Sequence, residues 1–158
     1  MNNITLVILG VFLLANSTFA TIVDSACLTA FKSAVLQAHN NFRTIHHVPL
    51  LVEDASLVST AQNYAKNLSS TNTFAHSGAK GLGENLAMYG STALPDCATL
   101  AKKFVQMWYD EVAKYDFAKA TFTPCCGIAI ANNKAVGVCN YSTAGNYLGQ
   151  FATNVLKA

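Results

Sequence analysis

The chain has 158 residues, of which 52% are hydrophobic and 11% are charged, and its formal net charge at pH 7 is +2. This small, scattered positive charge argues against a nucleic-acid partner and against electrostatic binding to an anionic membrane surface. The length suits one domain with one hydrophobic core.

The first twenty residues are typical of a secretory signal peptide. The uncharged apolar run from Ile4 to Ala15 is too short to span a bilayer as a stable helix, and no later segment is long enough. Small residues precede the expected cleavage after Ala20. The leader has no Lys or Arg, which leaves an uncleaved anchor or a buried first helix as alternatives. We expect residues 1–20 to be a signal peptide, residues 21–158 to be one domain, and the protein to be secreted.

Two amphipathic helices are predicted next. The first begins at Ser25 and ends by about Val48, with Asp24 or Ser25 as its N-cap. The second covers roughly Ser56 to Leu68, with Asp54 as its N-cap. Apolar residues recur at helical spacing in both. They are Leu28, Phe31, Val35, Ala38 and Phe42 in the first, and Leu57, Ala61, Tyr64, Ala65 and Leu68 in the second.

The segment from Ser69 to Gly90 has neither helical nor strand periodicity and contains four glycines, which predicts a loop with special backbone geometry. Polar side chains gather in it, where a rigid scaffold commonly presents functional groups. They are His76, Ser77, Glu84 and Asn85.

A third helix is predicted from about Asp96 to Tyr115, and it carries a carboxylate on its apolar side. The stripe comprises Leu100, Phe104, Met107, Trp108 and Tyr115. Glu111 lies three and four residues from members of this stripe. A desolvated carboxylate must be paired, hydrogen-bonded or protonated, which makes Glu111 a candidate site residue.

Two β-rich runs around Asn132-Asn133 predict a hairpin, because asparagine tolerates the positive φ of a tight turn. Counting outward from these two turn residues, Cys126 directly faces Cys139 at a non-hydrogen-bonded position, where the strands come closest. This register predicts a Cys126–Cys139 disulfide, with two reduced core thiols as the alternative.

Five cysteines in a secreted domain leave at least one unpaired or intermolecular. The pairing of Cys27, Cys97 and Cys125 stays open. No C-x2-C pair exists, which argues against a zinc finger. Neither face of the hairpin is polar, so the sheet must be covered on both sides, and an α+β fold with a three-layer αβα sandwich satisfies every stripe.

The order of several short motifs resembles the cysteine-rich secretory, antigen 5 and pathogenesis-related (CAP) superfamily and its SCP domain. In length the chain is similar to the Golgi-associated plant pathogenesis-related group. The motifs are His39-Asn40 with Arg43 and Pro49-Leu50, AQNYAKNL from Ala61, His76-Ser77, Gly83-Glu84-Asn85-Leu86, Trp108-Tyr109-Asp110-Glu111, Cys139-Asn140-Tyr141, Gly145-Asn146-Tyr147 and Gly149-Gln150.

The resemblance implies a cleft lined by two histidines and two glutamates. Three of the four positions match this chain, at His76, Glu84 and Glu111, and in some members such a cleft holds zinc or another divalent metal. The family's second histidine lies in a strand element that this chain lacks between 124 and 125. We therefore expect one sheet strand to be deleted, leaving an unpaired sheet edge.

The resemblance also implies a non-enzymatic secreted protein that binds a lipid or sterol, or an extracellular protein partner, in defence or host interaction. Two alternatives stay open. One is a truncated, inactive isoform, because of the missing strand. The other is a metal-dependent hydrolase with Glu84 or Glu111 as general base.

Overall fold

The computed structural model describes residues 23–111 and 125–142. The predicted signal peptide lies outside these residues, and so do the chain segment just before Cys125 and the glycine motifs near the C-terminus. Within the described ranges, none of the helices combines the length and the apolar character that a membrane span needs.

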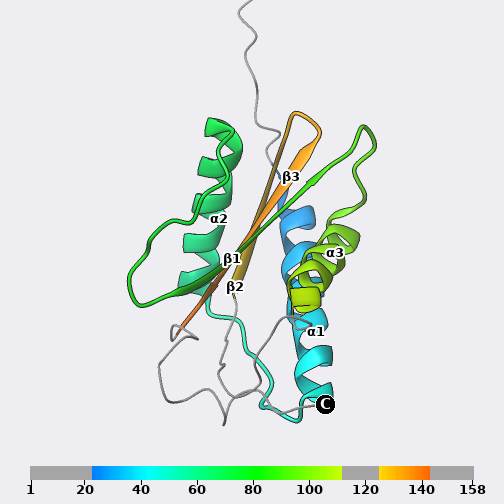
Figure 1. Ribbon diagram of the computed structural model, residues 1–158. Helices are drawn as coiled ribbons and strands as arrows, with labels where there is room; N and C mark the ends of the chain where they lie inside the picture. The colour runs from blue at the N-terminus through cyan, green and yellow to red at the C-terminus, as the bar shows by residue number, and fades with distance from the viewer. Residues whose placement is uncertain (1–22, 112–124, 143–158) are drawn as a thin grey trace, which may run out of the picture.

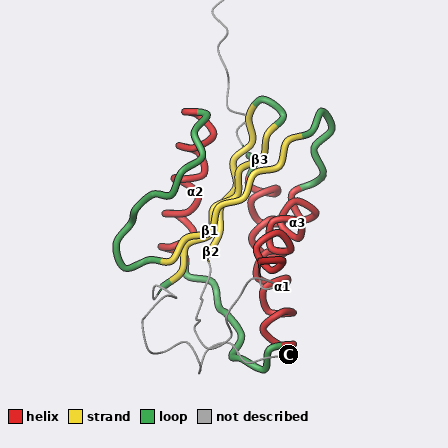
Figure 2. The backbone as a smooth tube through the Cα atoms, in the orientation of Figure 1, coloured by secondary structure: helices red, strands yellow, loops and turns green. Residues whose placement is uncertain are grey.

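The described elements form three layers, as the sequence predicts. They are α1 (Ser25–Ile45), α2 (Ala55–Thr71), β1 (Gly83–Gly90), α3 (Cys97–Tyr109), β2 (Cys125–Ala131) and β3 (Lys134–Tyr141). The strands form an antiparallel sheet in the order β1-β3-β2. Helix α2 covers one face, and α1 and α3 cover the other (Figure 1). The tube view shows the sheet between these helices (Figure 2).

An aspartate caps the start of each helix, where it accepts hydrogen bonds from backbone N–H groups of the first turn. Asp24, and not Ser25, caps α1 and accepts from Cys27 at 2.6 Å. Asp54 caps α2 and Asp96 caps α3. Helix α2 continues to Thr71, three residues beyond the expected end, because nothing interrupts it before Asn72.

The third helix ends at Tyr109, earlier than the sequence predicts, with Asp110 as its C-cap. Helical spacing of apolar residues continues beyond this point in the sequence, but spacing alone does not mark a helix end. Tyr115 lies outside the described residues. Met107 is 45% exposed, so its expected place on the buried stripe is wrong.

The prediction of a loop over the whole of Ser69 to Gly90 is also wrong, because Gly83–Gly90 forms β1 and pairs along its length with β3. This strand has glycine at both ends and no β-branched residue, so its local β-propensity is low. Pairing with β3, which lies more than forty residues later in the sequence, makes it a strand.

The hairpin forms as predicted. Asn132 and Asn133 have φ values of 49° and 59°, the left-handed pair of a type I′ turn. The turn sets the register in which Cys126 opposes Cys139, and a disulfide joins these residues across a Cα–Cα distance of 4.0 Å. The predicted bridge is therefore confirmed.

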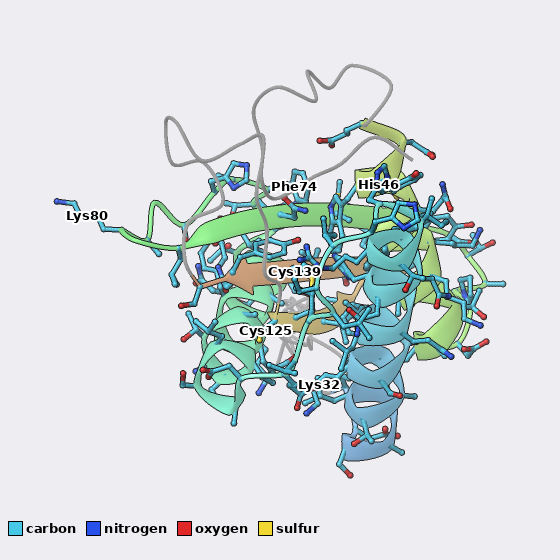
Figure 3. The ribbon with its side chains drawn as sticks, turned by 90° about the horizontal axis from the view of Figure 1, so that it is seen from below. Lys32, His46, Phe74, Lys80, Cys125 and Cys139 are labelled. Carbon is cyan, nitrogen blue, oxygen red and sulfur yellow. A yellow bond between two sulfur atoms is a disulfide. The ribbon has the colours of Figure 1, made fainter. Side chains whose placement is uncertain are left out.

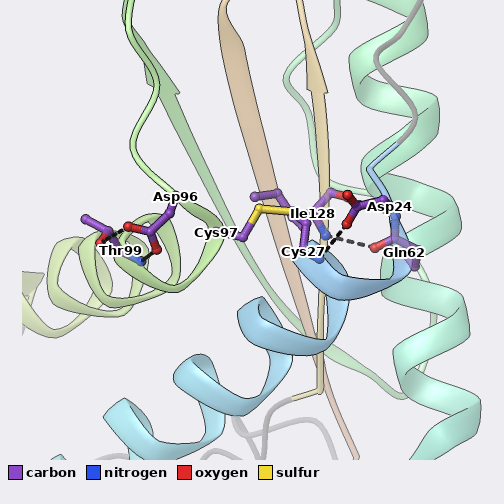
Figure 4. The surroundings of a disulfide bond; sticks show 7 residues. All are labelled: Asp24, Cys27, Gln62, Asp96, Cys97, Thr99 and Ile128. Atoms are coloured by element: carbon purple, nitrogen blue, oxygen red, sulfur yellow. Dashed lines mark hydrogen bonds between the residues drawn. A yellow bond between two sulfur atoms is a disulfide. The ribbon is translucent and has the colours of Figure 1, made fainter.

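The structure also shows the pairing of the three remaining cysteines. A disulfide between Cys27 and Cys97 joins the first turns of α1 and α3 (Figure 4). Cys125 is a free, buried thiol beside the start of α2 (Figure 3). It accepts a hydrogen bond from the backbone N–H of Asp54 at 3.1 Å.

Helix α2 approaches the sheet at Gly127 so closely that a Cβ there would lie 2.4 Å from the Cα of Gln62. The buried Gln62 amide then bonds both backbone groups of Ile128. Its Nε2 donates to the Ile128 oxygen at 2.8 Å, and its Oε1 accepts from the Ile128 nitrogen at 2.9 Å (Figure 4). Because Ile128 opposes Gly137 at a non-hydrogen-bonded position, these groups face away from β3. A side chain thus satisfies part of the β2 edge that we expected to be unpaired.

We predict that Gln62→Leu destabilises the domain, because it leaves the two Ile128 groups buried without partners. The expected loss is about 1–3 kcal/mol for each unpaired group, measured as the free energy of unfolding in urea. The neighbouring Asn63 is exposed, so Asn63→Leu is the matched control and should change stability by less than about 0.5 kcal/mol. Equal effects of the two variants would contradict this role of Gln62.

His39 lies within the α1 and α3 side of the core, as a structural histidine. Its Nδ1 donates to the Val35 carbonyl at 2.9 Å, and its ring centroid lies 6.1 Å from that of Trp108 and 6.4 Å from that of Tyr141. Burial is the main cause that lowers the pKa of His39 to about 4, and the positive charge of Arg43 lowers it further. The ring is therefore neutral in the folded protein at neutral pH.

We predict that acidification destabilises the domain through His39. The unfolded chain binds a proton at this residue near pH 6.5 and the folded chain only near pH 4. Stability is therefore complete above pH 6.5 and falls by roughly 3 kcal/mol between these two values. Urea unfolding from pH 4 to 7.5 measures this slope.

His39→Gln should flatten the slope while lowering stability at all pH values. His47 is exposed, and asparagine tolerates its φ of 53°, so His47→Asn is the control and should keep the wild-type slope. An unchanged slope in His39→Gln would show that other groups cause the pH dependence.

Candidate functional site

The structure brings His76 and Glu84 together where the loop after α2 enters β1. The imidazole Nδ1 donates to Glu84 Oε1 at 3.0 Å. The histidine side chain is 69% exposed, whereas the glutamate side chain is 9% exposed. Because Nδ1 carries a proton in this bond, the pair holds the ring in one orientation.

Two other groups hold the Glu84 carboxylate in place. The backbone N–H of Ser77 donates to Oε1 at 2.7 Å, and Asn140 Nδ2 donates to Oε2 at 3.3 Å. Burial by itself raises the pKa of Glu84, but hydrogen bonds from Ser77, His76 and Asn140 together lower it below its ordinary value. The carboxylate is therefore ionised at neutral pH and positions the histidine.

Helix α2 fixes the loop that carries His76. The hydroxyl of Tyr64, on α2, donates to the Ala75 carbonyl at 2.7 Å. The position of the imidazole thus depends on the position of α2 against the sheet. Burial, with the charge of Glu84, raises the pKa of Tyr64, so its hydroxyl keeps its proton at neutral pH.

Asn140 is a site residue that the sequence analysis did not single out. It opposes Glu84 on β1 and Cys125 on β2, so the three side chains form one row on the face that α2 covers. Asn140 is 1% exposed, and its Oδ1 has no hydrogen-bond partner among the described residues. The motif Cys139-Asn140-Tyr141 contains this residue, but only the register between β1 and β3 places it beside Glu84.

Glu111 follows α3 and is exposed, so the structure does not place it among the apolar residues of the predicted stripe. Tyr141 belongs to the core on the α1 and α3 face. Burial of this tyrosine is the main cause that raises its pKa, and the negative charge of Glu111 raises it further. The His76–Glu84 pair instead faces the α2 side. The predicted convergence of all three residues in one cleft stays a prediction.

The donor set does not fit a metal ion in the part of the chain that the structure describes. A zinc site needs three or four protein ligands, and no group of three His, Cys, Asp or Glu side chains there could hold an ion. A zinc or other divalent metal ion held by His76, Glu84 and Glu111 therefore stays a prediction. With the proton on Nδ1, the neutral ring can still accept a hydrogen bond at Nε2.

Comparisons with known proteins agree with this architecture. The family model described as "CAP: Cysteine-rich secretory protein family" matches residues 36–153. Protein PRY2 of Saccharomyces cerevisiae is 30% identical over 146 residues, and the match covers 80% of this chain and 41% of PRY2. The chain thus spans about two fifths of that relative.

Two further proteins are similar over most of their length. Golgi-associated plant pathogenesis-related protein 1 of Homo sapiens is 34% identical over 150 residues, covering 80% of this chain and 92% of that protein. The solved structure of NaASP2 with Zn2+ has a TM-score of 0.67 at 21% identity, covering 85% of this chain and 90% of that one. At this identity the structure supports the fold alone.

The family model covers most of the chain, and the human relative matches it over nearly its whole length. The αβα layers are those that the motif order predicts. The chain belongs to the cysteine-rich secretory protein (CAP) family.

Proposed function

We propose that the protein is secreted and acts without catalysis, by binding a lipid or sterol outside the cell. The observation that carries the proposal is the exposure of large apolar side chains in a domain with few charges. Val52 is 77% exposed, Leu50 62%, Phe74 48% and Met88 43%. Phe74 and Met88 line one hollow beside the end of α2, and adjoining exposed apolar side chains favour contact with an apolar ligand.

Two features support secretion. Disulfides persist in oxidising compartments, and the described residues contain two of them. The family is described as secretory. A role in defence or host interaction, which the resemblance implies, belongs to the same proposal, as does an extracellular protein as the alternative ligand.

We predict that the protein expressed in a eukaryotic secretory host appears in the medium with Thr21 as its first residue. Thiol titration of the denatured, non-reduced chain should give one thiol, because two disulfides use four of the five cysteines. Retention in the membrane fraction with an intact leader would contradict cleavage after Ala20. Three or more thiols would contradict the oxidising compartment.

We predict saturable binding of a lipid to the delipidated protein, because its exposed apolar side chains gain free energy when they leave water. Radiolabelled cholesterol and palmitate, each titrated below its critical concentration, provide the measurement. Protein unfolded by reduction in urea and then dialysed is the control for non-specific adsorption. The absence of saturable binding to both lipids would refute the proposed function.

A further inference from the structure

Two Asn-x-Ser/Thr sequons, the acceptor sequence for N-linked sugar, lie in the chain after the expected leader. They are Asn67-Leu68-Ser69, on α2, and Asn140-Tyr141-Ser142, at the end of β3. The function proposed above uses neither as a modification site. Because the two asparagines differ sharply in exposure, the structure distinguishes between them.

Asn67 lies on the solvent face of α2. The buried residues of this helix, among them Gln62, Ala65 and Leu68, face the sheet, whereas Asn67 is exposed. Among the described residues no hydrogen bond involves its side-chain amide, and its backbone carbonyl accepts from the Thr71 hydroxyl at 2.8 Å. The amide nitrogen can therefore carry a substituent that extends into water.

The surface around Asn67 is polar but nearly uncharged. Lys66 is the one charged residue of α2, although the solvent face of a helix commonly carries several charges. The other exposed residues that share this face with Asn67 at helical spacing have small or short polar side chains. They are Ser56, Thr60, Asn63 and Ser70. These side chains project little from the helix, so the face has room for a glycan, and a glycan would supply the hydration that charges provide elsewhere.

Asn140, by contrast, has no space for a glycan in the folded domain. It lies on β3, the central strand of the sheet, and is 1% exposed. Its Nδ2 is the atom that would carry the sugar, and this atom donates to Glu84 Oε2 at 3.3 Å. A sugar here would need room that a close-packed interior does not contain, and it would disrupt the contact with Glu84.

The helical position of Asn67 does not prevent the reaction, because the sequon is available before α2 forms. In a formed helix, residues two apart do not face each other, so Asn67 and Ser69 could not enter one enzyme site together. Most helical stability comes from tertiary packing, and α2 packs on β2 and β3, which follow much later in the sequence. The nascent chain therefore presents this sequon unfolded, and folding then leaves the sugar outside.

We propose that Asn67 carries an N-linked glycan in the secreted protein and that Asn140 is unmodified. The donor is an oligosaccharide on a lipid diphosphate. The Asn67 Nδ2 forms a bond to the anomeric carbon, the bond from that carbon to the diphosphate oxygen breaks, and the amide loses one proton. The inference rests on the secretion that the proposed function includes, since the chain must enter the secretory pathway to meet this donor, and it does not depend on lipid binding.

The test uses the full-length protein secreted by a eukaryotic host. Treatment with peptide N-glycosidase in heavy-oxygen water releases N-linked sugar and converts each carrier asparagine into labelled aspartate. Peptide mass spectrometry should find this label at Asn67 and not at Asn140. The intact protein should lose the mass of a single glycan in the same treatment.

Three variants assign the glycan to its sequon. Ser69→Ala removes the first sequon without changing Asn67 and should abolish the glycan completely. Ser69→Thr keeps an acceptor sequence at the same position and should keep the glycan, which separates a lost sequon from a structural effect of position 69. Ser142→Ala is the matched control, because it removes the second sequon at an exposed residue. This variant should keep both the glycan and the wild-type urea midpoint.

The outcomes separate the inference from the proposed function. A folded, secreted protein without a glycan would overturn the site and leave secretion intact. Label at Asn140, or a glycan that survives Ser69→Ala and disappears in Ser142→Ala, would overturn the assignment to Asn67. An unglycosylated chain that stays in the cytosol with its leader would overturn secretion and the site together.

Discussion

The contact between α2 and the middle of β2 is the constraint on which the rest of this domain depends. Gly127 has no side chain, which lets the helix backbone come close enough for the Gln62 amide to reach both backbone groups of Ile128. A larger residue at 127 would move the helix outward and leave those buried groups unpaired, which costs more than the hydrogen bonds themselves provide. This contact therefore sets the distance of one entire layer from the sheet.

The His76–Glu84 pair follows from that distance and from the strand register. Tyr64, two residues after Gln62, bonds the carbonyl that precedes His76, so the helix carries the histidine to its place. The position of Glu84 does not depend on α2, because the pairing of β1 with β3 sets this residue opposite Asn140. The helix thus positions an exposed imidazole and the sheet positions a buried carboxylate, and one hydrogen bond joins the two groups.

Features encoded over short stretches of sequence were predictable, and features that depend on distant contacts were not. The Asn132-Asn133 turn needs only local backbone preferences, and the register of Cys126 and Cys139 follows from it by counting. Strand β1 has weak local propensity and forms because β3 offers it a partner. The Cys27–Cys97 bridge depends on how α1 and α3 pack, and the exposure of Glu111 depends on where α3 ends. The helical periodicity of the sequence predicts neither the packing of α1 against α3 nor the end of α3.

The two faces of the sheet have different roles because they are covered unequally. Two helices cover the face that holds His39 and Phe104, and the apolar core there is nearly closed. A single helix, α2, covers the other face (Figure 1). Apolar surface remains open beyond its C-terminal end, where Phe74 and Met88 are exposed, and polar groups gather near its N-terminal end in the row of Glu84, Asn140 and Cys125. The α2 face therefore combines exposed apolar side chains beyond one end of the helix with a row of buried polar side chains near the other end.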